Sequence, residues 1–517
     1  MHLVSTVTTA AICGIEARKV VVEADISGGL PSFVMVGFLA SEVKEAQDRI
    51  RTALLNSGFR LPASRVTVSL SPADVRKSGS WFDLPIAVAV LGAMGIIPPG
   101  MEDMMIAGEL GLSGAIRPVP GIMEMAFRAK EFGCGTCIVP AENLAEGANA
   151  PDVDVKGAWS LRQVIAFMTG EGRLEEPAEY LPKEEMREPA MDFAELKGQP
   201  LLRRAAEITA AGFHHMLMIG PPGCGKSLTA KCLPSILPAL TKEEAIEITR
   251  IHSVAGILPE NSRLIGERPF RAPHHTATGA SLAGGGGYPR PGEISLAHGG
   301  VLFLDELPEF RPQVLETLRQ PLEEGKITIT RVHGDYTFPA HFILAAAMNP
   351  CRCGYFPDRT RCACTEADVK KYLEHISRPF LDRIDLCVEV GLPSYDDLRD
   401  PAPGESSAKI RERVENAVEI QKERYRGTSL RFNGELGGEE LERWCRLGSA
   451  EDKLLKAAYK KYSLTGRGCM RILKVARTIA DLDGSGLIRE EHLMEALGFR
   501  MADRRLWGLE GGGWNGL

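Results

Sequence analysis

The most constraining feature of this chain is a glycine-rich loop that joins an apolar run to a helix. Residues 220–227 read Gly-Pro-Pro-Gly-Cys-Gly-Lys-Ser and directly follow Met216–Ile219. In the pattern G-x-x-x-x-G-K-[ST], backbone N–H groups cradle phosphates and the helix N-terminus adds its dipole. We expect Lys226 to reach the β- and γ-phosphates of a nucleotide and Ser227 to hold Mg²⁺. The loop predicts a nucleotide site formed by Gly220, Pro221, Pro222, Gly223, Cys224, Gly225, Lys226, Ser227 and Leu228.

Two later apolar runs also end in polar side chains. Val301–Leu304 is followed by Asp305 and Glu306, and the run 342–348 is followed by Asn349. In open α/β sheets, ligands bind at the carboxyl ends of strands. We expect Asp305 to hold Mg²⁺, Glu306 to activate the attacking water, and Asn349 to hydrogen-bond that water or the γ-phosphate. One such residue alone would read as a strand-end cap, but three in this order favour ATP hydrolysis.

Bulk properties limit the remaining possibilities. A chain of 517 residues is too long for one core, so we expect three or four domains. The sequence contains no apolar run of membrane-spanning length and no evident secretory signal. With a nucleotide site and scattered cysteines, reduced thiols and a cytoplasmic location are expected. The net charge of −7 gives no global attraction to nucleic acid, so a DNA-binding surface would have to be local.

Composition and periodicity divide the chain into an α/β multidomain arrangement. Charged, proline-containing residues 171–190 and the Pro/Asp/Gly/Ser-rich residues 394–407 are typical of linkers. The predicted units are an accessory domain (1–170), an ATPase core (191–393), a helical domain (408–500) and a tail (501–517).

Several longer motifs resemble one family. They are the phosphate loop, Arg271-Ala-Pro-His-His-Thr, Pro291-Gly-Glu-Ile-Ser-Leu-Ala-His, residues 301–310, Leu318-Arg-Gln-Pro-Leu-Glu, Asn349-Pro-Cys, and Phe82-Asp-Leu-Pro-Ile in the first domain. Together they resemble the magnesium-chelatase-like AAA+ ATPases of the YifB/ComM type, and the likeness extends from Val20 to about Arg500. The resemblance implies an N-terminal Lon-protease-like α+β domain, a central AAA+ P-loop α/β domain and a C-terminal helical lid that carries sensor 2.

The resemblance also implies an activity and partners. It suggests an ATP-dependent homo-hexameric ring that acts on branched or single-stranded DNA as a branch-migration helicase, in recombination or transformation. Two alternatives remain open. One is a metal-chelatase-type motor subunit, which would need a separate porphyrin-binding partner. The other is a protein-remodelling AAA+ ATPase, with the first domain as substrate adaptor.

Two arginines acquire roles from the same resemblance. The segment Leu381-Asp-Arg-Ile-Asp is similar to the one that supplies the arginine finger, so Arg383 would reach into the neighbouring subunit's ATP site. Ser377-Arg378-Pro379 stands where the family usually has Ser-Gly-Pro, and Arg378 therefore remains an alternative. Leu464-Thr-Gly-Arg467 resembles sensor 2, which places Arg467 at the γ-phosphate.

Two basic segments are candidates for DNA contact. The stretch 263–290 is expected to be an insert and carries Arg263, Arg268, Arg271, His274, His275 and Arg290. Residues 325–339 alternate like a β-hairpin and carry Lys326, Arg331 and His333. Basic side chains on such loops would neutralise phosphates without reading sequence. An ordinary solvated loop and hairpin is the alternative.

Four cysteines form a separate cluster. Cys351, Cys353, Cys362 and Cys364 give a Cys-x-Cys, eight-residue, Cys-x-Cys arrangement that could satisfy tetrahedral Zn²⁺. The usual spacing is Cys-x₂-Cys, so reduced structural cysteines or a redox-sensitive pair remain alternatives.

The first domain lacks the groups that a Lon-type protease needs. Aligned on the family motifs, the serine position is Ile86 and the lysine position is Met123. Without them a nucleophile cannot be activated, so we interpret this domain as a non-proteolytic accessory module. Lys77 and Ser80 lie close in sequence, and only a structure can show whether they face each other.

Overall fold

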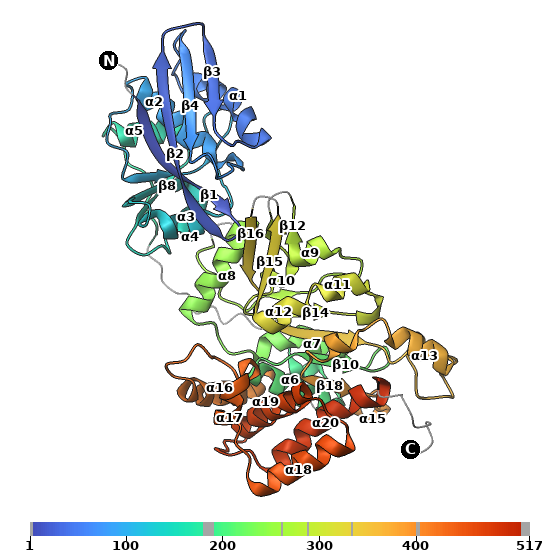
Figure 1. Ribbon diagram of the computed structural model, residues 1–517. Coiled ribbons are helices and arrows are strands. Elements are labelled where there is room, and N and C mark those ends of the chain that lie inside the picture. Colours follow the sequence, from blue (N-terminus) through green and yellow to red (C-terminus); the bar gives the residue numbers. More distant parts are fainter. Residues whose placement is uncertain are drawn as a thin grey trace.

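Three units follow one another along the chain, and a computed structural model shows their arrangement. It describes residues 4–178, 191–259, 262–286, 289–331, 334–399 and 404–507. The first domain lies at one end, the ATPase core in the middle and a helical domain at the other end (Figure 1). Within these residues, none of the helices combines the length and apolar character needed to cross a membrane.

The first domain is built on a seven-stranded sheet in the order β3-β4-β2-β1-β5-β8-β9. Helix α2 is apolar on all sides, is buried along nearly its whole length, and packs against β1 and β2. The strands are β1 (Ser5–Cys13), β2 (Glu16–Ser27), β3 (Ser32–Val36), β4 (Arg65–Ser71), β5 (Met104–Ile106), β6 (Glu109–Leu110), β7 (Ile116–Arg117), β8 (Thr136–Pro140) and β9 (Asp154–Ala158). The helices are α1 (Ser41–Asn56), α2 (Asp83–Ala93), α3 (Ile122–Ala129), α4 (Leu144–Gly147) and α5 (Leu161–Met168).

The ATPase core is a five-stranded parallel sheet in the order β11-β14-β17-β10-β18. Its central strands are buried on both faces and read as continuous apolar runs, as expected for a parallel sheet covered by helices. The strands are β10 (Met216–Ile219), β11 (Phe270–Arg271), β14 (Val301–Leu304), β17 (Ile343–Met348) and β18 (Leu386–Glu389). The helices are α6 (Pro200–Gly212), α7 (Lys226–Ile236), α8 (Lys242–Ala255), α9 (Gly279–Ala283), α10 (Glu293–Leu296), α11 (Pro312–Glu316), α12 (Arg319–Glu324), α13 (Glu366–Leu373) and α14 (Arg378–Leu381).

Two small hairpins project from this core towards the first domain (Figure 1). The predicted hairpin is confirmed: β15 (Lys326–Arg331) pairs antiparallel with β16 (Gly334–Pro339). Beside it, β12 (Gly284–Gly285) pairs with β13 (Arg290–Pro291), and Arg331 Nε donates to the Gly286 carbonyl at 3.4 Å. His333 lies outside the described residues.

The C-terminal unit is helical, as the sequence predicts. It contains α15 (Tyr395–Arg399), α16 (Ser407–Arg424), α17 (Gly438–Trp444), α18 (Ser449–Lys461), α19 (Gly466–Leu482) and α20 (Glu490–Trp507). Helix α20 continues past the predicted boundary at residue 500. Leu506 is buried, and Trp507 Nε1 donates to the Leu373 carbonyl at 3.2 Å. These contacts give the end of the helix a partner that its local sequence does not reveal.

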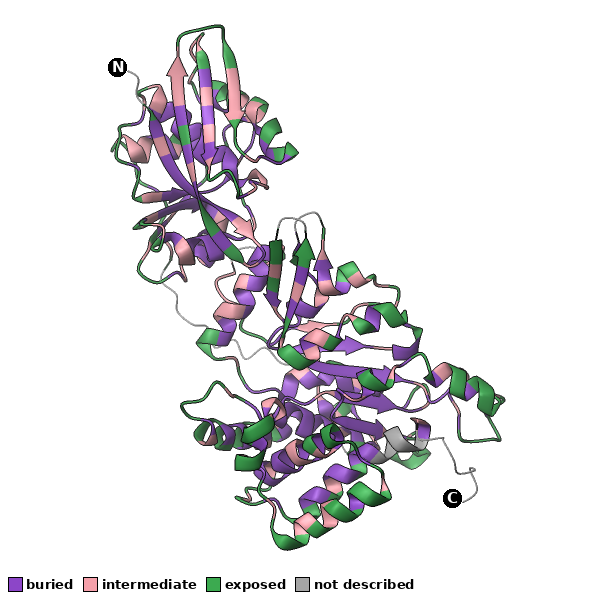
Figure 2. Cartoon of the chain, in the orientation of Figure 1, coloured by how far each residue is buried: buried purple, intermediate pink, exposed green. Residues whose placement is uncertain are grey.

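The first domain docks on α8 of the ATPase core. The buried Glu124 carboxylate accepts from Arg250 Nε at 2.6 Å, and the Gly121 N–H donates to the Ser253 carbonyl at 3.0 Å. Asn149 Nδ2 adds a third bond, to the Arg263 carbonyl at 2.7 Å. Residues coloured as buried lie on the inner strands and helices of each unit, whereas exposed residues are frequent on the hairpins and outer helices (Figure 2).

Candidate active site

The phosphate loop lies between β10 and α7, as its sequence predicts. Gly223 and Gly225 have φ of +82° and +95°, a region that favours glycine. A Cβ at Gly220 would lie 2.4 Å from the Val390 carbonyl oxygen, so this position requires glycine for steric reasons. The loop therefore has the backbone shape that lets N–H groups converge on phosphate.

Lys226 is held inside the loop. Its Nζ donates to the carbonyls of Gly220 at 2.6 Å and Pro221 at 2.9 Å, and to Asn349 Oδ1 at 3.2 Å. Burial lowers the pKa of the Lys226 ammonium, and the nearby Cys224 and Asp305 oppose that shift. The contact with Asn349 joins the first and third predicted strand ends.

Ser227 and Asp305 also meet. Ser227 Oγ donates to Asp305 Oδ2 at 2.8 Å, from the start of α7 to the end of β14. A hydroxyl and a carboxylate oxygen are ligands that Mg²⁺ accepts alongside substrate phosphates and water. The donor set therefore fits the predicted ion.

Glu306 is exposed and takes an unusual backbone conformation. Its φ is +52°, which costs a non-glycine residue of order 1 kcal/mol or more and is found mostly at functional sites. Its N–H donates to Asp305 Oδ1 at 2.9 Å, and its side chain contacts His275 Nδ1 at 3.2 Å. The insert thus contacts the carboxylate that the sequence assigns to water activation.

These groups surround one open cavity of about 420 Å³. It is lined by Pro222, Gly223, Gly225, Lys226, Ser227, Leu228, Asp305, Glu306, Met348 and Asn349. Three loop residues predicted for the site, Gly220, Pro221 and Cys224, are not part of this lining; the carbonyls of Gly220 and Pro221 accept from Lys226. The cavity therefore combines a phosphate cradle, an Mg²⁺ donor pair, a carboxylate and an amide.

Arg383 and Arg467 do not line this cavity. Both contact Glu323 at the end of α12: Arg383 Nη2 lies 2.5 Å from Glu323 Oε1, and Arg467 Nη1 lies 3.5 Å from the same oxygen. The Arg383 side chain is 7% exposed, whereas Arg467 is 65% exposed. Arg378, the alternative finger, is exposed, and its Nη2 donates to the Trp507 carbonyl at 3.3 Å.

Sequence reasoning assigned His275 to possible DNA contact rather than to Glu306, and it gave Glu323 no role. Both belong to motifs that carry the family resemblance, so the motif was the available signal. Two insert arginines also differ from expectation. Arg268 is buried and donates to the Pro238 and Gly299 carbonyls, and Arg271 pairs with Glu293 at 2.6 Å. Their guanidinium groups are therefore already bonded within the fold of the ATPase core.

The positions noted in the first domain are now placed. Ile86 and Met123 are fully buried. The Lys77 ammonium is buried as well and donates to the Pro72 carbonyl, so it does not pair with Ser80. No described contact therefore assembles a serine–lysine pair at this position.

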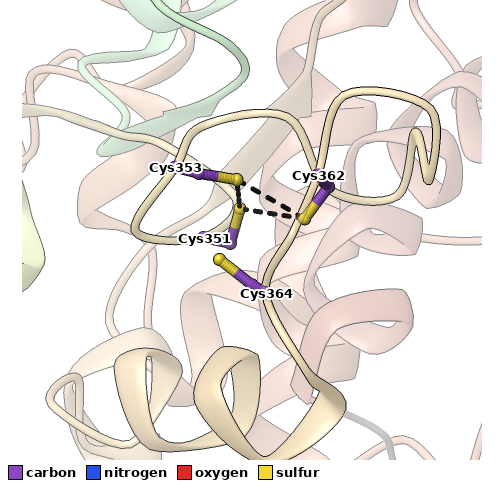
Figure 3. Close-up of side chains that lie close together, drawn as sticks. All are labelled: Cys351, Cys353, Cys362 and Cys364. Atoms are coloured by element: carbon purple, nitrogen blue, oxygen red, sulfur yellow. Dashed lines mark hydrogen bonds between the residues drawn. The ribbon is translucent and has the colours of Figure 1, made fainter.

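The four predicted cysteines come together in the loop between β17 and α13. Their sulfur atoms all lie within 4.8 Å of one another (Figure 3). The loop begins two residues after Asn349, beside the nucleotide cavity.

Comparison with known proteins identifies the family. Three family profiles match the chain. The profile described as "Magnesium chelatase, subunit ChlI" matches residues 192–398, and the profile described as "Subunit ChlI of Mg-chelatase" matches residues 22–143. The profile for the C-terminal region of magnesium-chelatase subunit ChlI matches residues 404–500. The chain is 42% identical over 504 residues to the uncharacterized protein YifB of Salmonella typhimurium, covering 97% of both chains. It is 41% identical over 502 residues to competence protein ComM of Haemophilus influenzae, covering 96% of this chain and 97% of that one.

A more distant relative shares part of the chain. The magnesium-chelatase 38 kDa subunit of Acidiphilium rubrum is 25% identical over 333 residues, covering 58% of this chain and 87% of its own. The full-length matches and the three consecutive profiles agree with the order of units in the structure. The chain belongs to the YifB/ComM family of magnesium-chelatase-like AAA+ ATPases.

Proposed function

We propose that this chain forms a cytoplasmic, homo-hexameric ring that uses ATP to move branched or single-stranded DNA, as a branch-migration helicase in recombination or transformation. The observation that carries the proposal is the pair of neighbouring hairpins, which carry the exposed Arg290 and Arg331 and are joined by the bond from Arg331 Nε to the Gly286 carbonyl. A relative named for competence, 41% identical over nearly the whole chain, supports a role with DNA.

The cavity supports ATP hydrolysis as the source of energy. Lys226 and the loop N–H groups bind the phosphates, and Ser227 and Asp305 hold Mg²⁺, which neutralises charge on the phosphate oxygens. Glu306 orients the attacking water and accepts its proton, and Asn349 donates from its amide to the γ-phosphate or the water. In this structure Lys226 donates to the carbonyls of Gly220 and Pro221. When a nucleotide binds, the Lys226 ammonium would donate to its phosphate oxygens instead.

The arginines support a site shared between subunits. Arg383 and Arg467 meet at Glu323, away from the cavity lining of their own chain. A cation that reaches no phosphate within its own subunit can still complete the neighbour's site in a ring. We assign Arg383 as the arginine finger that acts on the nucleotide of the adjacent subunit, and Arg467 as the sensor 2 residue that contacts the γ-phosphate.

The hairpin arginines suit a sequence-independent grip on DNA. Arginine neutralises backbone phosphates, and the resulting affinity falls steeply with salt. The net charge of −7 means that such contacts have to be local, which two neighbouring hairpins provide. The Lon-protease-like first domain, with Ile86 and Met123 at the catalytic positions, serves as a non-proteolytic accessory module.

DNA-stimulated ATP hydrolysis tests this proposal. We expect branched DNA to accelerate hydrolysis by the full chain and branch migration to require ATP. An Arg290→Ala/Arg331→Ala double variant should lose DNA stimulation and show a shallower salt dependence of DNA binding. Arg446→Ala, an exposed arginine in the helical domain, is the matched control. Stimulation by unfolded protein, with no response to any DNA, would contradict the proposal.

A metal-chelatase motor subunit is the second candidate. It is favoured by the profiles over all three units and by the likeness to the Acidiphilium rubrum subunit. In that case, a porphyrin-binding partner, and not DNA, would stimulate ATP hydrolysis, and metal insertion would require both proteins.

A further inference from the structure

We propose that Cys351, Cys353, Cys362 and Cys364 bind one Zn²⁺ ion per chain, and that this ion fixes the loop that packs against the phosphate loop and Asn349. The cluster is separate from the donor set for Mg²⁺, which consists of oxygen atoms. Thiolates are soft ligands that select zinc over magnesium. The two metal sites would therefore not compete.

The sulfur positions fit a tetrahedral ion. Cys351 Sγ lies 3.3 Å from Cys353 Sγ and 3.7 Å from Cys362 Sγ, and Cys353 Sγ lies 3.5 Å from Cys362 Sγ. In a tetrahedron with Zn–S bonds of about 2.3 Å, neighbouring sulfurs are about 3.8 Å apart. Cys364 Sγ points into the same space (Figure 3), and all four cysteines are free of disulfides.

The backbone around the first cysteine pair is shaped to support thiolates. Gly354, directly after Cys353, has a φ of +89°, and its N–H donates to the Cys351 carbonyl at 3.0 Å. This turn directs the Phe356 N–H at Cys351 Sγ, at 3.4 Å. Hydrogen bonds from outer groups to the ligand atoms orient metal ligands and stabilise their charge.

The charge of the loop also suits a tetrathiolate centre. Four thiolates and one Zn²⁺ carry a net charge of −2, which needs positive neighbours. The loop supplies Arg352, Arg359 and Arg361, and Arg359 Nη1 donates to the Cys364 carbonyl at 2.8 Å. Asp358, the acid within the loop, accepts from the Thr360 backbone and hydroxyl. Arg359 thus lies beside Cys364, where its charge can offset part of the thiolate charge, whereas Arg361 Nε lies 3.8 Å from Asp358.

The loop needs a tether because it has little regular structure of its own. The described residues 351–364 form turns without a helix or a strand, although Cys351 and Cys362 are buried in the core. A small segment of this kind is commonly held by a structural metal whose binding energy is folding energy. Without a bound metal, only the hydrogen bonds of a few turns and the burial of Cys351 and Cys362 would fix the loop.

The position of the loop explains why it must be held. A Cβ added at Gly354 would lie 2.8 Å from Pro222 Cδ and 3.9 Å from Asn349 Cγ. The loop therefore touches both the phosphate loop and the amide at the end of β17. We infer that the zinc ion keeps these two groups in register, which makes it a structural metal rather than a catalytic one.

Metal analysis of the purified full chain tests the proposal without relying on ATP hydrolysis. We expect elemental analysis to find about one zinc per chain, released when a mercurial reagent blocks the thiols. Replacement by Co²⁺ should give the intense thiolate charge-transfer and visible bands of a tetrahedral tetrathiolate site. This measurement needs no variant, so it stands even if a variant fails to fold.

Variants locate the site. Cys362→Ser should lower the zinc content at least tenfold, whereas Cys469→Ser, a partly buried cysteine on α19 outside the cluster, should keep it. The proposal is overturned if the wild-type chain holds less than about 0.2 zinc and shows no cobalt spectrum. Stoichiometric iron in place of zinc, or full zinc retention in Cys362→Ser, would also overturn it.

Discussion

His275 Nδ1 lies 3.2 Å from Glu306 Oε2, so the insert between α8 and β14 contacts the carboxylate assigned to water activation. The same insert carries β12 and β13, which present Arg290 to the proposed DNA path. Glu306 is held at a φ of +52° in this arrangement. If the chain acts on DNA as proposed, a shift of the insert on DNA binding would release the carboxylate and couple DNA to ATP hydrolysis through this side-chain contact.

Removal of this contact should uncouple hydrolysis from DNA. A polar contact between partly exposed side chains is worth about 0.2–1 kcal/mol, which corresponds to about 1.5- to 5-fold in an equilibrium. We expect His275→Ala to raise the ATP hydrolysis rate without DNA by a factor in this range and to reduce the stimulation by DNA. His274→Ala is the comparison, because His274 Nδ1 contacts Thr276 and its ring centroid lies 4.0 Å from that of His275, so it removes the neighbouring ring but not the Glu306 contact. A variant with unchanged basal rate and unchanged DNA stimulation would contradict the link.

Variants of Glu306 and Lys226 should separate nucleotide binding from ATP hydrolysis. Glu306→Gln keeps the shape of the cavity but removes the base, so hydrolysis should fall by about 10²- to 10⁴-fold while nucleotide binding persists. Lys226→Ala should lose both. Fluorescent-nucleotide binding and phosphate release measure the two properties. Glu309→Gln, an exposed acid three residues further on, should leave both unchanged.

The shared-site assignment predicts complementation. Arg383→Ala and Lys226→Ala chains should each hydrolyse ATP at least about 100-fold more slowly than wild type. When the two variants are mixed, sites that pair an intact Lys226 with an intact Arg383 of the neighbour should restore up to about a quarter of the activity. Mixed rings that form without any recovery would show that the arginine does not act across the interface.

Arg378 provides the matched comparison. It lies on the same short helix region but is exposed and bonded to the Trp507 carbonyl. If Arg383 is the finger, Arg378→Ala should retain most of the activity. If Arg378→Ala loses ATP hydrolysis while Arg383→Ala retains it, Arg378 and not Arg383 is the arginine finger.

The sequence predicted the contents of the cavity because they depend on local signals. Lys226, Asp305 and Asn349 each lie directly at a strand end or loop, and parallel strands bring such ends to one edge. The structure places these three and Glu306 around one cavity, while their chemical roles remain predictions. The apolar run before each of these residues was enough to predict the strand, whatever the rest of the chain does.

The partners of the arginines could not be predicted in this way. Glu323 meets Arg467 only because the fold brings the start of α19 near the end of α12, and no local pattern encodes that approach. The prediction that the arginines of the insert are available for DNA contact fails at Arg268 for a related reason. It treated Arg268 as a free cation, whereas Glu244 lies 3.2 Å away and two carbonyls accept its other donors. Burial and pairing are properties of the fold rather than of composition.

His215 should make stability depend on pH. Its Nδ1 accepts from the Leu344 N–H at 3.1 Å, and burial lowers the pKa of its imidazole to about 4. An unfolded histidine has a pKa of about 6.5, so between these values the unfolded chain binds more protons than the folded one. The free energy of unfolding should therefore fall as the pH drops from about 6.5 to 4, by at most about 3 kcal/mol.

Urea unfolding at a series of pH values measures this effect. His215→Gln removes the titrating group, so the slope between pH 6.5 and 4 should become shallower. His274→Gln changes an exposed histidine and should keep the wild-type slope. Equal slopes in all three proteins would exclude His215 as the source.

The Glu124–Arg250 pair should hold the first domain on the ATPase core. The Glu124 side chain is fully buried and Arg250 is 31% exposed, and burial raises the pKa of Glu124 while Arg250 opposes that shift. Arg250→Met leaves a buried carboxylate without its cation. We expect a loss of roughly 2–3 kcal/mol in unfolding free energy, below the 3–5 kcal/mol of a fully buried pair because Arg250 is partly solvated.

A double-mutant cycle separates the pair from its surroundings. Adding Glu124→Gln to Arg250→Met removes the buried charge, so the double variant should recover most of the stability lost in Arg250→Met. Lys130→Met breaks the exposed pair with Asp152, 2.8 Å apart, and should cause no measurable change. If Arg250→Met alone is as stable as wild type in urea unfolding, the bond does not hold the domains together. Docking would then depend on the backbone contact between Gly121 and Ser253.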